Sequence, residues 1–142
     1  MQEYLKKVQL PGQRVNLLFA CLGVIVEQIS PERVVMRLPF RPDFIQGGGM
    51  IAGGIIATLA DEAMAHAALA NLNPGETTAT IEMNIRYLKG CASGDIAAIA
   101  APVKKGRRVI TLQAEIVDAH QQTVALAGAS FMILDKKTAS TG

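Results

Sequence analysis

The spacing of hydrophobic and polar positions along this chain follows a period of two in two separate regions. Residues 24–29 and 33–39 alternate on either side of the turn Ser30-Pro31-Glu32, which predicts a β-hairpin. Beyond Pro74 the alternation returns four times, which predicts strands over residues 77–88, 95–103, 109–118 and 123–134. In the first of these, one face of the strand is expected to carry Thr80, Glu82, Asn84 and Arg86, and the other Ile81, Met83, Ile85 and Tyr87.

Between the two β regions lies an apolar segment, from about residue 52 to about residue 71, that is rich in alanine, leucine and methionine. It contains no proline, and no glycine after Gly54, so it predicts one long helix. A helix that is apolar on nearly every side is buried, either in a core or in a membrane. The apolar run 50–60 is far shorter than the ~20 residues that span a membrane, so this is a core helix. Its few polar residues are Thr58, Asp61, Glu62 and His66.

The order of two strands, one helix and four strands predicts an α+β fold, in which a six-stranded antiparallel sheet wraps around one long central helix. In this packing each element buries its one apolar face. The whole chain, residues 1–142, is expected to form a single domain, with a helical lead-in over residues 1–20 and a frayed polar tail over residues 135–142. Such a sheet leaves two edges to protect, which the association of two copies would achieve.

The composition of the chain mainly excludes classes of function. A net charge of +2 and 4% aromatic residues give no basis for nucleic-acid binding. The N-terminal residues lack the hydrophobic segment of a signal peptide, and Cys21 and Cys91 lie far apart, so we expect a cytoplasmic protein with reduced thiols and no membrane partner. The two histidines are well separated and form no close pair with a cysteine, so we expect no metal site, and no cofactor is expected either.

Two features of the central segment point to chemistry. Glycines at 47–49 and at Gly53 and Gly54 surround the start of the helix, where the first N–H groups have no intrahelical partner and can bind an oxyanion. Asp61 lies halfway along the helix, and a carboxylate is rarely buried unless it is paired or used. The residues alone leave an alternative open, in which the glycines form a hinge and Asp61 sits at a solvated edge.

The pattern Gln46-x-x-Gly49-x-x-Ala52-Gly53-Gly54, followed by Leu59-Ala60-Asp61, resembles the hotdog-fold acyl-CoA thioesterases of the phenylacetic acid degradation (PaaI-like) branch. The strand 80–88, the basic turn at 106–108 and the final strand are also similar to that family, so the resemblance covers roughly residues 22–134. In the family the helix entrance typically reads Asn-x-x-Gly-x-x-His-Gly-Gly, and an acidic residue follows on the helix. This chain has Gln46 in place of the asparagine and Ala52 in place of the histidine.

The resemblance implies hydrolysis of acyl-CoA thioesters to free acid and CoA, in sites shared between the two subunits of a homodimer. The catalytic groups would be Asp61 as base or nucleophile, the Gly53 N–H as oxyanion donor, Gln46 as second donor or water holder, and Thr80 as water positioner. Further residues expected to contact the substrate are Gly49, Gly54, Asn84, Lys105, Arg107 and Arg108, of which the basic three would grip the CoA phosphates. Whether dimers pair again into homotetramers stays open.

The spacing of Gly53 and Asp61 also favours a shared site. The two residues are eight positions apart, which is about 12 Å along a helix axis, so both cannot touch one carbonyl carbon from a single chain. If both act, Asp61 must meet the Gly53 of a partner subunit across a two-fold axis.

Other interpretations stay open. Glu62 and His66 are four residues apart and are expected to pair on the helix surface, with His66 as a less favoured catalytic base. Ala52 cannot hydrogen-bond through its side chain, which keeps a non-catalytic acyl-CoA-binding hotdog protein as an alternative. A hotdog dehydratase or hydratase would pair a histidine with the carboxylate, and Ala52 counts against that activity.

Overall fold

The two β regions of the sequence come together in one sheet. The computed structural model describes residues 1–136, in which β1 (Ile25–Ile29) and β2 (Val34–Leu38) form the predicted hairpin. The later strands are β3 (Glu76–Tyr87), β4 (Ile96–Lys105), β5 (Val109–Val117) and β6 (Thr123–Asp135). The six strands join in the order β1-β2-β4-β5-β6-β3, and every neighbouring pair is antiparallel.

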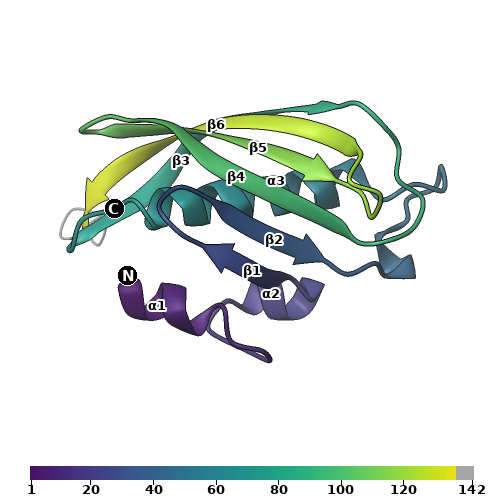
Figure 1. Ribbon diagram of the computed structural model, residues 1–142, viewed down its shortest axis with the longest axis horizontal. Coiled ribbons are helices and arrows are strands. Elements are labelled where there is room, and N and C mark those ends of the chain that lie inside the picture. The colour runs from purple at the N-terminus through teal and green to yellow at the C-terminus, as the bar shows by residue number, and fades with distance from the viewer. Residues whose placement is uncertain (137–142) are drawn as a thin grey trace.

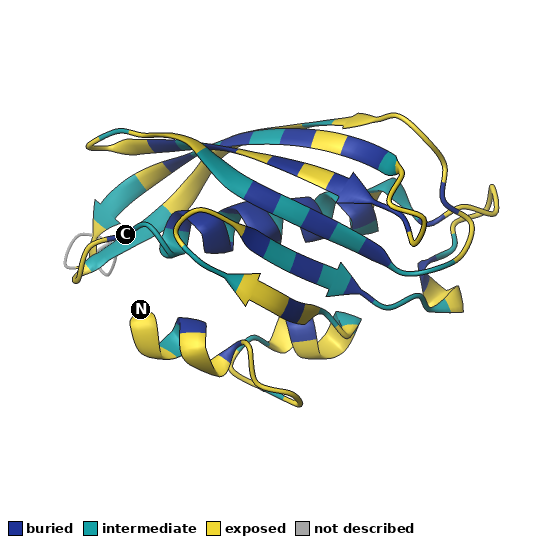
Figure 2. Ribbon diagram, viewed as in Figure 1, coloured by how far each residue is buried: buried dark blue, intermediate teal, exposed yellow. Residues whose placement is uncertain are grey.

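Helix α3 (Gly53–Leu69) packs along one face of this sheet, which curves around it (Figure 1). This arrangement confirms the α+β hotdog fold that the sequence predicts. Small side chains allow the close approach, because Ala60, Ala63 and Ala67 of α3 and Ala98 and Ala100 of β4 are all fully buried. Buried residues alternate with more exposed ones along the middle strands (Figure 2), as the period of two requires.

The N-terminal region forms two short helices, α1 (Gln2–Lys7) and α2 (Leu17–Leu22). Asn16 caps α2, because its side-chain oxygen accepts a hydrogen bond from the Phe19 N–H at 3.1 Å. Phe19 is 1% exposed, and its ring centre lies 5.1 Å from that of His66 on α3. The lead-in therefore covers part of the α3 surface that the sheet leaves open.

The face assignment predicted for the strand after the helix is wrong at its first member. The β3–β6 register shifts between Thr80 and Glu82, so Ile81 is an extra residue in a β-bulge. Thr80 pairs with the buried Phe131 and therefore faces α3, whereas Glu82 pairs with Ser130 on the opposite face of the sheet. A regular alternation of polar residues gives no sign of such an insertion.

The last strand extends into the first residues that the sequence assigns to the tail. Asp135 pairs with Glu76, and the Lys136 N–H donates to the Gly75 carbonyl at 2.9 Å, so the first residues of the expected frayed tail belong to the sheet edge. The rest of that tail, residues 137–142, lies outside the described residues. Within residues 1–136, no helix is both long and apolar enough to cross a membrane.

Candidate active site

The glycine-rich segment before α3 forms a closed turn that follows the short helix η1 (Pro42–Phe44). The Gln46 N–H donates to the Met50 carbonyl at 2.8 Å, and the Gly49 N–H donates back to the Gln46 carbonyl at 2.9 Å. Gly49 has φ 83°, a left-handed conformation that favours glycine. The Gln46 side-chain oxygen accepts a hydrogen bond from Gly48 N–H, so its amide NH2 group remains able to donate to a ligand.

The start of α3 presents unpaired backbone donors. Ala52 is the N-cap residue and provides no side-chain cap, and the N–H groups of Gly53 and Gly54 find no acceptor among residues 1–136. The Gly53 carbonyl accepts a hydrogen bond from the Tyr87 hydroxyl at 2.7 Å, which ties the helix entrance to β3. These N–H groups lie at the positive end of the helix dipole and can bind an oxyanion.

Asp61 carries an oxygen atom that nothing in the described chain satisfies. Its Oδ1 is shielded from solvent and has no hydrogen-bond donor within residues 1–136. Burial raises the pKa of the Asp61 carboxyl from its usual 3.8. A half-buried carboxylate with a free acceptor and raised basicity is suited to take a proton from water.

One chain does not bring the proposed catalytic groups to a single point. Asp61 lies two helical turns beyond Gly53, about 12 Å along the axis of α3. Thr80 faces the α3 side of the sheet and lines a pocket with Glu62 and Ala65, the α3 turn that follows Asp61. That Asp61 of one chain meets Gly53 of a second chain therefore remains a prediction.

The predicted substrate contacts lie in three separate places. Asn84 pairs with Gly128, which places its side chain on the sheet face turned away from α3. Lys105 donates through its Nζ to the Asn71 carbonyl, at the opposite end of α3 from Gly53. Arg107 and Arg108 are exposed in the same β4–β5 turn. Within one subunit, Asn84 and the basic turn are thus remote from the helix entrance, where Gly49 and Gly54 lie.

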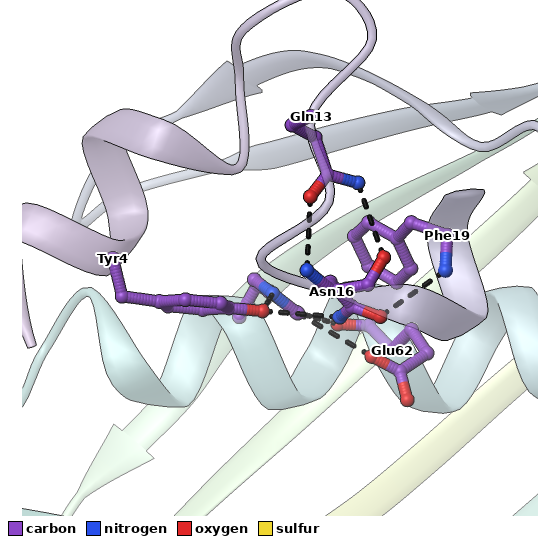
Figure 3. Close-up of polar contacts among 6 residues, drawn as sticks. Tyr4, Gln13, Asn16, Phe19 and Glu62 are labelled. Carbon is purple, nitrogen blue, oxygen red and sulfur yellow. Dashed lines mark hydrogen bonds and ion pairs between the residues drawn. The ribbon is translucent and has the colours of Figure 1, made fainter.

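Glu62 and His66 pair as expected, with 3.8 Å between Glu62 Oε2 and His66 Nδ1, but the pair does not lie on the helix surface, because the lead-in covers it. His66 is 2% exposed, and its ring packs against Tyr4 and Phe19, while Figure 3 shows Tyr4, Asn16 and Glu62 close together. Tyr4 hydroxyl lies 2.9 Å from His66 Nε2, and Asn16 donates to the Tyr4 oxygen at 3.0 Å. Sequence reasoning missed this cluster because Tyr4 and His66 are 62 residues apart.

His66 is unsuited to act as a base in this environment. Its Nδ1 lies 2.7 Å from the Glu62 carbonyl, which can only accept, so Nδ1 carries the proton and Nε2 accepts from Tyr4. Burial lowers the pKa of His66, which keeps the ring neutral. Within the described part of the chain, no three residues of the metal-binding types gather into a site.

The family model and the related sequences that match this chain are described as thioesterases or putative esterases. A family model described as "Thioesterase superfamily" matches residues 48–125. The chain is 30% identical to "Putative esterase ComA2" of Bacillus subtilis over 123 residues, covering 85% of this chain and 97% of that protein. It is 28% identical to a "Putative esterase" of Saccharolobus solfataricus over 137 residues, covering 96% and 97% of the two chains.

Solved structures share the fold. A thioesterase from Haemophilus influenzae superposes with a TM-score of 0.80 at 21% identity and covers 85% of each chain. A mutant of the phenylacetic acid degradation protein PaaI from Thermus thermophilus superposes with a TM-score of 0.77 at 25% identity, covering 84% of this chain and all 100% of that one.

The two glycines at the entrance of α3 should respond differently to alanine. A Cβ at Gly54 meets no atom within 4 Å, so Gly54→Ala should raise the unfolding free energy by up to about 1 kcal/mol through helix propensity. A Cβ at Gly53 lies 3.1 Å from a Tyr87 ring carbon, so Gly53→Ala must displace the ring and should give no gain. Chemical denaturation of both variants measures the difference. An equal gain in both would contradict the Tyr87 contact.

The burial of Asp61 predicts a pH-dependent stability. The pKa of Asp61 is raised in the folded state, so its charged form is disfavoured by folding, and Asp61→Asn should increase the melting temperature at pH about 7. As the pH falls through the raised pKa the native carboxyl takes up its proton, and the advantage of the asparagine should fade toward 3.8. Thermal unfolding across this range tests the trend, with Asp43→Asn as the matched control because the Asp43 side chain is 82% exposed. A pH-independent difference would contradict the argument.

Proposed function

This chain belongs to the thioesterase superfamily, and we propose that it hydrolyses acyl-CoA thioesters to a free acid and CoA. The observation that carries the proposal is the unpaired, solvent-shielded Oδ1 of Asp61 on the same helix that presents free N–H groups at Gly53 and Gly54. A carboxylate acceptor and an oxyanion-binding helix entrance are the two groups that thioester hydrolysis requires.

The reaction follows from these groups. Asp61 takes a proton from a water molecule as the water oxygen attacks the thioester carbonyl carbon. The carbonyl oxygen becomes an oxyanion, which accepts hydrogen bonds from the Gly53 N–H and from the Gln46 amide. Collapse of this intermediate breaks the C–S bond and releases CoA as a thiolate, a good leaving group that takes up the proton afterwards. Thr80 holds the attacking water. In an alternative course, Asp61 attacks the carbonyl directly and water hydrolyses the resulting anhydride.

The proposed site is shared by two subunits of a homodimer. Gly53 and Asp61 lie about 12 Å apart along the axis of α3, so one chain cannot supply both groups to one carbonyl. A two-fold axis that brings Asp61 to the Gly53 of a partner makes both sites equivalent. The β3 edge of the sheet supports this pairing, since it has unpaired backbone groups and exposes Ile81 at 50%.

The basic turn is proposed to bind the CoA phosphates across the same interface. Lys105 contacts the C-terminal end of its own α3, far from its own Gly53. When two α3 helices run antiparallel about the axis, the turn with Lys105, Arg107 and Arg108 extends beyond the helix entrance of the partner. Exposed arginines and lysines suit phosphate groups there.

Ala52 keeps one alternative function open. A protein that binds acyl-CoA without hydrolysing it has no need for Asp61, so replacing this carboxylate should leave its affinity for the ligand unchanged. A dehydratase or hydratase is disfavoured because His66, the histidine on α3, has both ring nitrogens occupied.

Thiol release from a panel of aryl- and alkyl-acyl-CoA esters tests the proposal. The native protein should hydrolyse some of them, and Asp61→Asn should lower kcat by about 10²–10⁴-fold through loss of the base. Because the active form is the carboxylate, the acid limb of the pH–rate profile should lie above the range of an exposed aspartate, as burial raises the pKa of Asp61. Asp43→Asn is the matched control. Tight binding without turnover in the native protein would favour the binding function instead.

A further inference from the structure

Within residues 1–136, two of the first four N–H groups of α3 remain free for a ligand. The Ile55 and Ile56 N–H groups both donate to the Ala52 carbonyl, at 3.0 and 3.3 Å, so they are already used inside the first turn. The free N–H groups are those of Gly53 and Gly54. A Cβ at Gly54 would meet no atom within 4 Å, so the space beside the second of these donors is open to a ligand.

The carbonyl group that shares a peptide unit with the Gly54 N–H has an additional hydrogen-bond partner. This carbonyl belongs to Gly53, and it accepts a hydrogen bond from the Tyr87 hydroxyl at 2.7 Å. A carbonyl oxygen has two lone pairs, so this bond adds to the intrahelical bond that a carbonyl in an α-helix accepts. A hydrogen bond to the carbonyl of a peptide polarises that peptide and makes its N–H a stronger donor. The Tyr87 hydroxyl therefore strengthens the Gly54 donor from the opposite side of the peptide.

The close approach of Tyr87 depends on the missing side chain of Gly53. A Cβ at Gly53 would lie 3.1 Å from the ring carbon Cζ and 3.2 Å from the hydroxyl oxygen of Tyr87. The backbone of Tyr87 is held by the sheet, because it pairs with the buried Ala125 of β6 and the next N–H, that of Leu88, donates to the Val124 carbonyl at 2.8 Å. The glycine thus allows a side chain fixed by the sheet to reach the helix entrance.

We propose that the Gly54 N–H donates to the oxyanion beside the Gly53 N–H, and that Tyr87 is a positioning residue that holds and polarises the peptide between the two glycines. The inference rests on the proposed thioester hydrolysis and adds a donor and a positioning residue to it. A peptide between two glycines has no side chain on either side to restrain its rotation, so the bond from β3 fixes its plane. The negative charge on the carbonyl oxygen develops in the transition state, so the effect of Tyr87 falls on kcat rather than on KM.

Tyr87→Phe removes the hydroxyl and keeps the ring. It should lower kcat by about tenfold with KM nearly unchanged, less than the roughly 10²–10³-fold cost of losing a whole oxyanion donor, because the Gly54 N–H itself remains. Thr58→Val is the matched control. Thr58 Oγ1 donates to the Gly54 carbonyl at 2.8 Å, a bond of the same type one peptide further along, but the N–H of that peptide, Ile55, is already paired with Ala52. The control should keep the native kcat, and thermal unfolding verifies that both variants are folded.

The infrared band of a bound thioester carbonyl measures the strength of the donors directly. The probes are phenylacetyl-CoA and hexanoyl-CoA, each labelled with a heavy carbon isotope at the thioester carbonyl and bound to Asp61→Asn, which leaves them unhydrolysed. The band should move to lower frequency on binding, because hydrogen bonds to the oxygen weaken the C=O bond. Adding Tyr87→Phe should reduce this shift, whereas adding Thr58→Val should leave it unchanged.

The two measurements separate this inference from the proposed function. Turnover with the same kcat in Tyr87→Phe as in the native protein would overturn the inference and leave the hydrolysis standing. A carbonyl shift that depends on Tyr87, without turnover of any ester, would uphold the donor assignment and overturn the hydrolysis. An equal loss of kcat in Thr58→Val, or a rise in KM alone in Tyr87→Phe, would overturn the positioning role. No shift on binding would overturn the donor assignment whatever the turnover.

Discussion

The structure depends on helix α3, which is held by packing against the sheet and carries a carboxylate oxygen, Asp61 Oδ1, that has no hydrogen-bond donor within residues 1–136. The side of α3 that faces the sheet is packed without exposure at Ala60, Ala63, Met64 and Ala67, so the helix cannot turn to hydrate its carboxylate. Asp61 Oδ1 therefore stays shielded with no donor from residues 1–136. An unpaired buried acceptor destabilises the folded state. Proteins retain such a group where a ligand or a second subunit supplies its hydrogen-bond donor.

The absence of a histidine at position 52 changes how the helix entrance can work. Ala52 leaves the α3 N-cap without a side-chain contact, so in the proposed reaction the oxyanion is bound by backbone N–H groups and by the Gln46 amide. Gln46 is suited to this because its side-chain oxygen already accepts the Gly48 N–H, so its NH2 group has no partner within residues 1–136 and can donate to a ligand.

Much of the fold was predictable, because each strand and the central helix has one apolar face that shows in the spacing of residues. The bulge at Ile81 was not predictable, because an inserted residue leaves no mark in an alternation of similar side chains. As a result of the bulge, Thr80 faces α3 and Glu82 faces the opposite side of the sheet. The burial of Glu62 and His66 was hidden for another reason. The residues that cover them, Tyr4 and Asn16, belong to a lead-in helix and a cap far away in the sequence, and only tertiary packing brings them to α3.

The central claim is that Asp61 of one subunit works with the helix entrance of the other, and a mixed dimer tests it most directly. Asp61→Asn removes the carboxylate, and Gly53→Pro removes the N–H at the first position of α3, where the fixed φ of proline suits a helix although the added atoms displace the Tyr87 ring. Each variant alone should be inactive. The heterodimer, isolated with two different tags, contains one fully native site and should recover about half of the native activity. No recovery in the heterodimer, or full activity in a stable monomer, would contradict the shared site.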